Sequence, residues 1–144
     1  MNPIFIQRIS YRLRFIPFIP KLITYFIRFF FSCYIPYRLK LGKEFKLGYG
    51  GLGVVIHERT IMGNDVHIDQ NVTIGGTSKK YNVPVLGNHI YIGAGAKVLG
   101  PITIGNNVVI GANSVVTKNI PSGSLVVGVP GKIIKTGILK KSYV

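Results

Sequence analysis

An aliphatic residue recurs at every sixth position through the middle of the chain. The members of this series are Ile56, Met62, Ile68, Ile74, Leu86, Ile92, Val98, Ile104, Ile110 and Val116. A period of six matches neither the helical period of 3.6 nor the strand period of 2, whereas hexapeptide repeats are typical of a parallel β-helix. The pattern therefore predicts short strands and tight turns, three hexads to a coil, with each aliphatic side chain stacked inward on its counterpart one coil further along.

Two features refine this prediction. Asparagines recur at or near the expected corners, where a left-handed backbone conformation suits Asn and Gly. These residues are Asn64, Asn88, Asn106 and Asn113. The series fails only at Lys80, inside the stretch 75–84, which we expect to form a loop projecting from one corner.

The chain divides into a basic, aromatic helical segment at 1–37, a β-helix domain at 38–134 and a basic tail at 135–144. On a helix, Lys21, Tyr25, Arg28 and Ser32 share one stripe of an otherwise apolar surface. Arg28 interrupts an apolar stretch that is too short for the roughly 20 residues of a membrane span, and no signal-peptide cleavage site follows it. Residues 1–34 are therefore expected to lie on an anionic membrane surface, to cap the open end of the solenoid, or to do both.

The charge of the chain is strongly positive, with 18 Lys and Arg against 4 Asp and Glu. No acidic residue occurs after Asp69. Such a surface suits anionic lipid or a phosphate-rich ligand, and no nucleic-acid-binding motif is present, so nucleic acid is not an expected partner. The single Cys33 excludes an intrachain disulfide.

Four segments resemble the serine acetyltransferase branch of the hexapeptide-repeat acyltransferases. They are 53–56, 71–77, 92–97 and 128–134. The resemblance covers 48–134 and nothing of residues 1–46, where true serine acetyltransferases have a longer helical domain. It implies an all-β fold, a left-handed parallel β-helix with a short α-helical segment before it, and acetyl-CoA as co-substrate.

The resemblance also implies a homotrimer whose active-site groove lies between subunits, and exposed apolar residues such as Val54 and Val109 are expected to contribute to that interface. The chain looks most like the subgroup from capsule and exopolysaccharide gene sets, so the expected acceptor is a saccharide hydroxyl. Serine O-acetylation and a non-catalytic, membrane-bound assembly role are the alternatives. The expected location is the cytoplasm, including the inner face of the membrane.

Acetyl transfer to a hydroxyl needs a general base, usually histidine. The family's Asp-His pair falls at Tyr49 and Gly50, and its second histidine at Val83, so neither is kept. Among the remaining histidines we favour His57, with His67 as the second candidate and His89 as structural. Glu58 and Asp69 are candidates for orienting the base.

The resemblance places coenzyme A along the later coils. The matching positions are Gly76, Ala94, Gly95, Ala112, Lys118 and Lys132. The small residues would let the pantetheine arm lie against the wall, and the two lysines would lie near the phosphates. Zinc carbonic anhydrases share this fold and use three histidines, but the spacing of His57, His67 and His89 does not match theirs, so no metal is expected.

Overall fold

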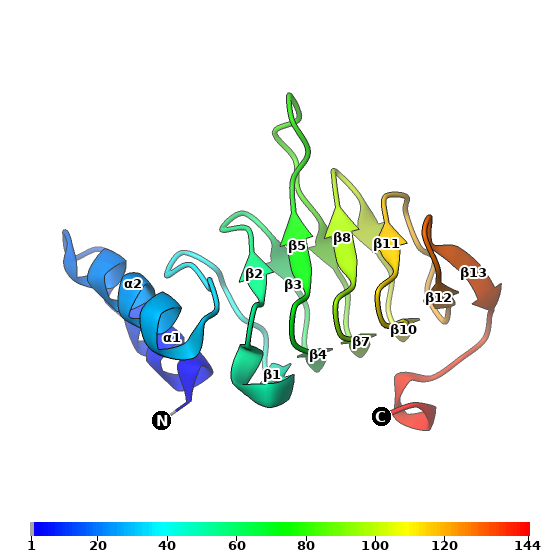
Figure 1. The fold of residues 1–144 in the computed structure, drawn as a ribbon, viewed down its shortest axis with the longest axis horizontal. Helices are drawn as coiled ribbons and strands as arrows, with labels where there is room; N and C mark the ends of the chain where they lie inside the picture. Colours follow the sequence, from blue (N-terminus) through cyan, green and yellow to red (C-terminus); the bar gives the residue numbers. More distant parts are fainter. Residues whose placement is uncertain (1) are drawn as a thin grey trace.

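A computed structural model of the chain describes residues 2–144, and it consists of a helical pair followed by a parallel β-helix (Figure 1). The helices are α1 (Pro3–Arg12) and α2 (Ile19–Phe31), and short 3-10 helices occupy Gly48–Gly51 and Lys140–Ser142. The strands are β1 (Lys46–Leu47), β2 (Val55–Ile56), β3 (Ile61–Met62), β4 (Val66–Ile68), β5 (Thr73–Gly75), β6 (Val85–Leu86), β7 (Ile90–Ile92), β8 (Lys97–Leu99), β9 (Thr103–Ile104), β10 (Val108–Ile110), β11 (Val115–Val116), β12 (Leu125–Val127) and β13 (Lys132–Lys135).

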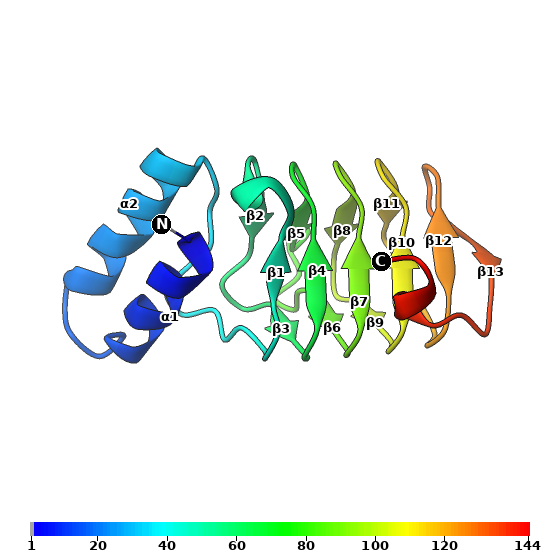
Figure 2. The same cartoon turned by 90° about the horizontal axis from the view of Figure 1, so that it is seen from below.

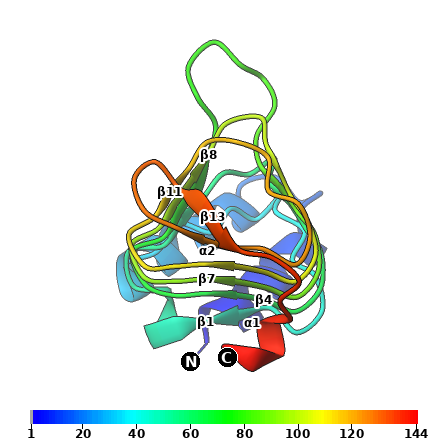
Figure 3. The same ribbon diagram turned by 90° about the vertical axis from the view of Figure 1, so that its right-hand side faces the viewer.

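The strands form three sheets, one on each face of a triangular solenoid. Their orders are β1-β4-β7-β10-β12-β13, β11-β8-β5-β2 and β3-β6-β9, and all pairs are parallel except β12 with β13. Seen from the carboxy-terminal end, the chain turns clockwise as it approaches the viewer, so the solenoid winds left-handed (Figure 3). The predicted hexapeptide-repeat β-helix is thus confirmed, and the helical pair stands before it (Figure 2).

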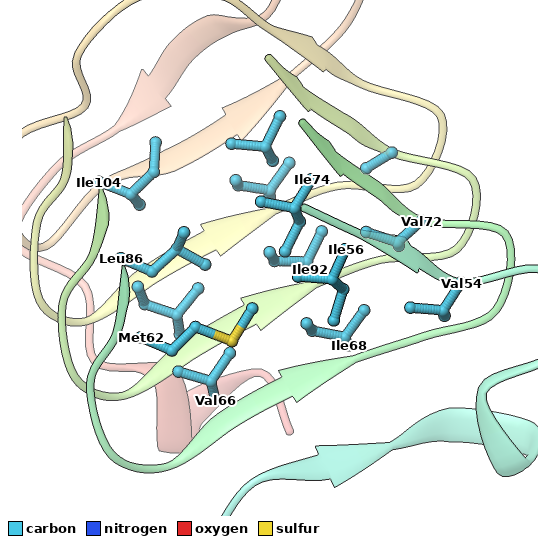
Figure 4. Close-up of a cluster of buried hydrophobic side chains, with 14 of the residues drawn as sticks. Val54, Ile56, Met62, Val66, Ile68, Val72, Ile74, Leu86, Ile92 and Ile104 are labelled. Carbon is cyan, nitrogen blue, oxygen red and sulfur yellow. The ribbon is translucent and has the colours of Figure 1, made fainter. Parts of the chain in front are cut away.

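The hexad series fills the interior of the solenoid, as predicted (Figure 4). Ile56 pairs in register with Ile74, and Ile74 with Val98. The second spacing is one hexad longer than the first because the loop at 75–84 lengthens that coil. Val54, expected on the surface, is fully buried instead. It precedes Ile56 by two positions, and side chains two apart along a strand share one face.

The corners are stabilised by a ladder of polar side chains. Backbone N–H groups of Lys43, Asn64 and Asn88 each donate to an Asn Oδ1 one coil further on, at 2.7–2.8 Å. The left-handed backbone predicted at the corner asparagines is found at Asn113, where φ is +57°. At the three ladder asparagines it falls instead on the next residue, as in Asp65 and His89. The asparagine itself is needed for its side-chain acceptor, and its successor makes the turn.

The helical pair caps the amino-terminal end of the solenoid. Ile27 is fully buried in the same apolar core as the coil residues. The Gln7 side chain donates to the carbonyl oxygens of Pro36 and Leu39, at 3.1 and 2.7 Å. Tyr34 already forms a parallel bridge with Val55 of β2. The capping interpretation of this segment is therefore correct for its inner face.

The tail folds back along the six-stranded sheet, so that the carboxy-terminal 3-10 helix lies over the region of β10 (Figure 2). Ile138 donates its backbone N–H to Gly123 O, and its side chain is buried. Val109, which the sequence suggested would be exposed, is only 3% exposed on the same face. Val54 and Val109 are therefore both buried, and neither side chain is available for the predicted trimer interface.

Candidate functional site

The projecting loop at 75–84 creates one candidate site. The Arg59 guanidinium lies 4.1 Å from the Tyr81 ring centroid and donates to Tyr81 O at 2.7 Å, which fixes the loop against the preceding corner. A cavity of about 320 Å³ opens beside this contact, and Val83 is among its lining residues. Val83 is the position at which the resemblance expects a histidine, so the loop corner is shaped like a site but lacks its base.

His57 directly follows β2 and points out of the barrel, as predicted. Its Nδ1 lies 3.1 Å from the backbone N of Arg59 and accepts that hydrogen bond. Glu58 is exposed and makes no contact with the imidazole among the described hydrogen bonds and ion pairs. The structure therefore gives His57 a local turn contact and no carboxylate partner among the residues it describes.

His67 lies on the outer face of β4, inside a small polar cluster. Its Nε2 is 3.4 Å from Oδ1 of Asp69, and its ring packs edge-on against Tyr91 with 5.3 Å between centroids. Tyr91 stands next to His67 in register on β7 and donates its hydroxyl to Oδ2 of the same carboxylate. Asp69 thus contacts both rings, which leaves the imidazole Nδ1 without a described partner inside the cluster.

The electrostatics of this cluster favour a neutral imidazole. Burial lowers the pKa of His67 below its ordinary value, and the Lys140 and Lys46 charges act in the same direction against the Asp69 carboxylate. The hydrogen bond to Asp69, aided by burial, raises the pKa of Tyr91 to about 12, so the phenol remains a donor near neutral pH. A neutral imidazole beside a carboxylate is the form that accepts a proton.

A cavity of about 500 Å³ adjoins His67, between the start of α1 and the first coil. It is lined by residues 2–4 and 45–47 together with Gly50 and His67. Gly50 is the position where the resemblance places the family's catalytic histidine. His67 therefore borders the same hollow that the missing imidazole would occupy.

A second polar group anchors the tail. Lys140, only 6% exposed, donates to the carboxylate and the backbone carbonyl of Asp65, and His89 Nδ1 lies 2.9 Å from Asp65 Oδ2. Burial alone would raise the pKa of Asp65, but the hydrogen bonds and charges of Lys140 and His89 together outweigh it, so the pKa is lowered. The structural role predicted for His89 agrees with this position. Within residues 2–144, no three His, Cys, Asp or Glu side chains gather in a way that could hold a metal ion.

Five of the six predicted coenzyme A residues lie at the two ends of the strands in the sheet β2-β5-β8-β11, and the sixth lies on β13. Ala94 and Gly95 precede β8, and Ala112 precedes β11 at the same corner one coil later. Gly76 follows β5 and exposed Lys118 follows β11, both at the opposite edge, whereas exposed Lys132 lies on β13.

Gly95 also has a structural reason to be glycine. Its φ is +73°, and an added Cβ would lie 2.1 Å from Asn113 Oδ1. The corner stacks Gly95 on Asn113, so a small residue is required there whether or not a ligand binds. The structure thus brings together three of the four small residues, Ala94, Gly95 and Ala112, and separates them from Gly76 and the lysines.

Two important residues were not anticipated from the sequence. Tyr91 could have been found, because it occupies the outward slot that matches His67 once the loop is counted as part of a longer coil. Lys140 offered no such signal, since its partner Asp65 is 75 residues away and the tail lies outside the repeat.

The description "Bacterial transferase hexapeptide (six repeats)" applies to the family model that matches residues 84–118. A serine acetyltransferase of Synechocystis sp. is 43% identical over 138 residues, covering 93% of this chain and 55% of the relative. One from Staphylococcus aureus is 47% identical over 117 residues, covering 80% of this chain and 54% of the relative.

Solved structures show the same likeness. The serine acetyltransferase from Brucella abortus has a TM-score of 0.90 at 31% identity, covering 95% of this chain and 57% of that one. The Neisseria gonorrhoeae serine acetyltransferase has a TM-score of 0.88 at 33% identity, with 97% and 55% covered. Another serine acetyltransferase was solved in complex with CoA, and its TM-score is 0.83.

Coverage this high includes most of residues 1–46, so the expectation that the likeness stops at the solenoid was wrong. The helical pair also has a counterpart in the serine acetyltransferases. The chain spans about half the length of the curated relatives that it matches. The repeats and the winding define the solenoid as a left-handed hexapeptide-repeat β-helix, and over 80–93% of its length the chain is similar to serine acetyltransferases.

Proposed function

We propose that the chain transfers an acetyl group from acetyl-CoA to a hydroxyl, and that serine is its acceptor. The observation that carries this proposal is the identity of 43–47% to curated serine acetyltransferases over 80–93% of the chain. It favours serine, which the sequence suggested only as an alternative, over the saccharide acceptor. The related structures with bound CoA support the choice of acyl donor.

His67 takes the role of the base in this proposal, in preference to His57. It is half-buried, lies 3.4 Å from a carboxylate and borders the cavity that also includes Gly50. His57 borders neither of the two cavities next to the family's histidine positions. Asp69 holds the imidazole from one side, and Tyr91 holds Asp69 in turn.

The reaction assigned to these groups is a direct transfer. The acceptor hydroxyl oxygen forms a bond to the acetyl carbonyl carbon while His67 takes the hydroxyl proton. The carbon–sulfur bond breaks, and coenzyme A leaves as a thiolate that takes the proton from His67, so the imidazole is neutral again. Burial lowers the pKa of His67, which favours the neutral imidazole that can accept the hydroxyl proton.

A saccharide is the second candidate acceptor, and one cavity favours it. This hollow of about 350 Å³ lies between α2 and the first coil, and three tyrosines line it together with Lys21, Arg38 and Glu58. The tyrosines are Tyr25, Tyr34 and Tyr37. Aromatic rings with a polar tip present both an apolar face and a hydroxyl, which suits the alternating faces of a sugar ring.

Release of the coenzyme A thiol, measured with serine and with a panel of mono- and oligosaccharides, tests the acceptor. We expect serine to give the highest kcat/KM. Faster turnover of a saccharide would favour the second candidate. The absence of thiol release with every acceptor, from protein that binds coenzyme A, would instead support a non-catalytic assembly role.

A homotrimer is the expected assembly. The resemblance places the groove between subunits, and exposed apolar side chains such as Ile61 and Val85, on neighbouring coils of one sheet, remain for an interface. Sedimentation equilibrium in mild detergent should give three times the chain mass. An Ile61→Glu variant should shift the distribution toward monomer, and a fully active wild-type monomer would contradict the expectation.

A further inference from the structure

We propose that the outer face of the helical pair docks on an anionic lipid bilayer. The face consists of large apolar side chains on α2 and the turn before it, all turned away from the solenoid. They are Phe15, Phe18, Ile19, Leu22, Phe26, Phe29 and Phe30. Phe15 and Phe29 are the most exposed of them, at 82% and 81%.

The two sides of α2 separate clearly. Pro20, Thr24 and Ile27 are buried against the protein. Leu22 and Phe29 lie on the opposite side of the helix, and the rings of Phe26, Phe29 and Phe30 form a cluster with centroid separations of 4.4 and 5.2 Å. Folding has therefore used one apolar side of this helix and left a second one in water, which monomeric soluble proteins rarely do with so large a patch.

Cationic side chains flank the apolar face. The predicted stripe of Lys21, Tyr25, Arg28 and Ser32 is exposed along its edge, next to Leu22 and Phe29. Arg14 lies at the turn, with its guanidinium 4.4 Å from the Phe15 ring centroid. Apolar side chains that enter the boundary of a bilayer while Lys and Arg contact the headgroups are typical of an interfacial helix.

The charge pattern favours lipid over a second copy of the chain. Residues 1–43 contain eight Lys and Arg and no Asp or Glu, because Glu44 is the first acid. Two such faces packed together would bring like charges close without any carboxylate to pair them. An anionic bilayer supplies the missing counter-charge over the whole face.

The length of α2 fits a helix that lies in the plane of the bilayer. Its 13 residues rise about 1.5 Å each, so the helix is shorter than the roughly 30 Å apolar core of a bilayer. None of the helices within residues 2–144 is long and apolar enough to cross a membrane. The proposal rests on these surface features alone and does not depend on the proposed acetyl transfer.

Flotation of the full chain with vesicles tests the proposal. We expect the protein to float with vesicles made of phosphatidylcholine and phosphatidylglycerol in equal parts. It should float at least five-fold less with phosphatidylcholine alone, or at high salt, which screens surface charges. The F18S/L22S/F29S variant should lose flotation, and K21Q/R28Q should reduce it several-fold. I134S/L139S is the matched control, since it removes exposed apolar side chains at the other end of the solenoid, and it should float like the wild type.

Circular dichroism and sedimentation of each variant without lipid separate docking from misfolding and from self-association. Wild-type protein that stays out of the anionic vesicle fraction would overturn the proposal. The proposal would also be overturned if the wild type formed a larger oligomer without lipid and F18S/L22S/F29S dissociated it. The apolar face would then be a protein interface. Equal loss of flotation in the control variant would also count against it.

Discussion

His67→Ala is expected to lower the rate of acetyl transfer by roughly 10²–10⁴, the usual contribution of a positioned general base. The substitution removes the proton acceptor next to the cavity with Gly50 and leaves the outward face of β4 otherwise intact. Since His67 lies outside the core series, coenzyme A binding and the unfolding midpoint should change little. Thiol release at saturating acetyl-CoA measures the effect.

The pH dependence gives an independent signature of this base. Because burial lowers the pKa of His67, the active neutral form should persist below the usual histidine pKa of about 6.5. The rate should therefore fall only as the pH drops through that lower pKa. Asp69→Asn removes the carboxylate that opposes this shift, so the acid limb should move to still lower pH.

His57→Ala is the matched control for both measurements. It removes an imidazole whose one described side-chain contact is a hydrogen bond from the Arg59 N–H, and we expect less than a five-fold change in rate. If His57→Ala abolishes turnover while His67→Ala stays active, the base is His57 at the end of β2. The proposed cluster would then be a surface feature of β4 and β7.

The solenoid could be predicted from the sequence because its physics is local. Each coil packs only on its neighbours, so the spacing from Ile56 to Ile74 along the chain is also their stacking in space. The one broken hexad at Lys80 likewise marked the loop correctly. Periodicity alone does not determine the handedness of the solenoid, so the left-handed winding was predicted from the family resemblance.

The candidate site was harder to predict because its contacts do not follow the repeat. The loop lengthens one coil by a whole hexad, so the residue in register with His67 is Tyr91, whereas Val85 pairs with Ile61. Whether Gly50 borders His67 depends on how α1 closes over the irregular first coil, where Tyr49 and Gly50 both have positive φ. The hexad pattern contains no information on such long-range closure.

The two polar clusters on the six-stranded sheet have different roles, which the hexad pattern does not predict. Asp65 and Asp69 flank one short strand, but Asp65 binds the tail through Lys140 while Asp69 contacts His67. The tail charge also lowers the pKa of His67. The tail therefore contributes both to covering the sheet and to keeping the proposed base neutral.

Ile92→Ala is expected to cost about 2–5 kcal/mol of unfolding free energy, as large-to-small changes in well-packed cores do. Ile92 is fully buried at the middle of the solenoid, in register with Ile68 on one side and Ile110 on the other. Truncation opens a cavity against both neighbouring coils at once. Each coil contacts only its neighbours, so the two ends of the solenoid are coupled only through the coils between them.

Urea unfolding at a fixed protein concentration measures this effect. The midpoint should fall, while the m-value stays the same if unfolding remains two-state. Ile134→Ala serves as control because Ile134 is 59% exposed, and surface substitutions usually change stability by less than about 0.5 kcal/mol. Equal midpoints for the two variants would mean that the inward stack does not carry the stability of the coils. A lower m-value for Ile92→Ala alone would indicate that the two ends of the solenoid unfold separately once the central coil is weakened.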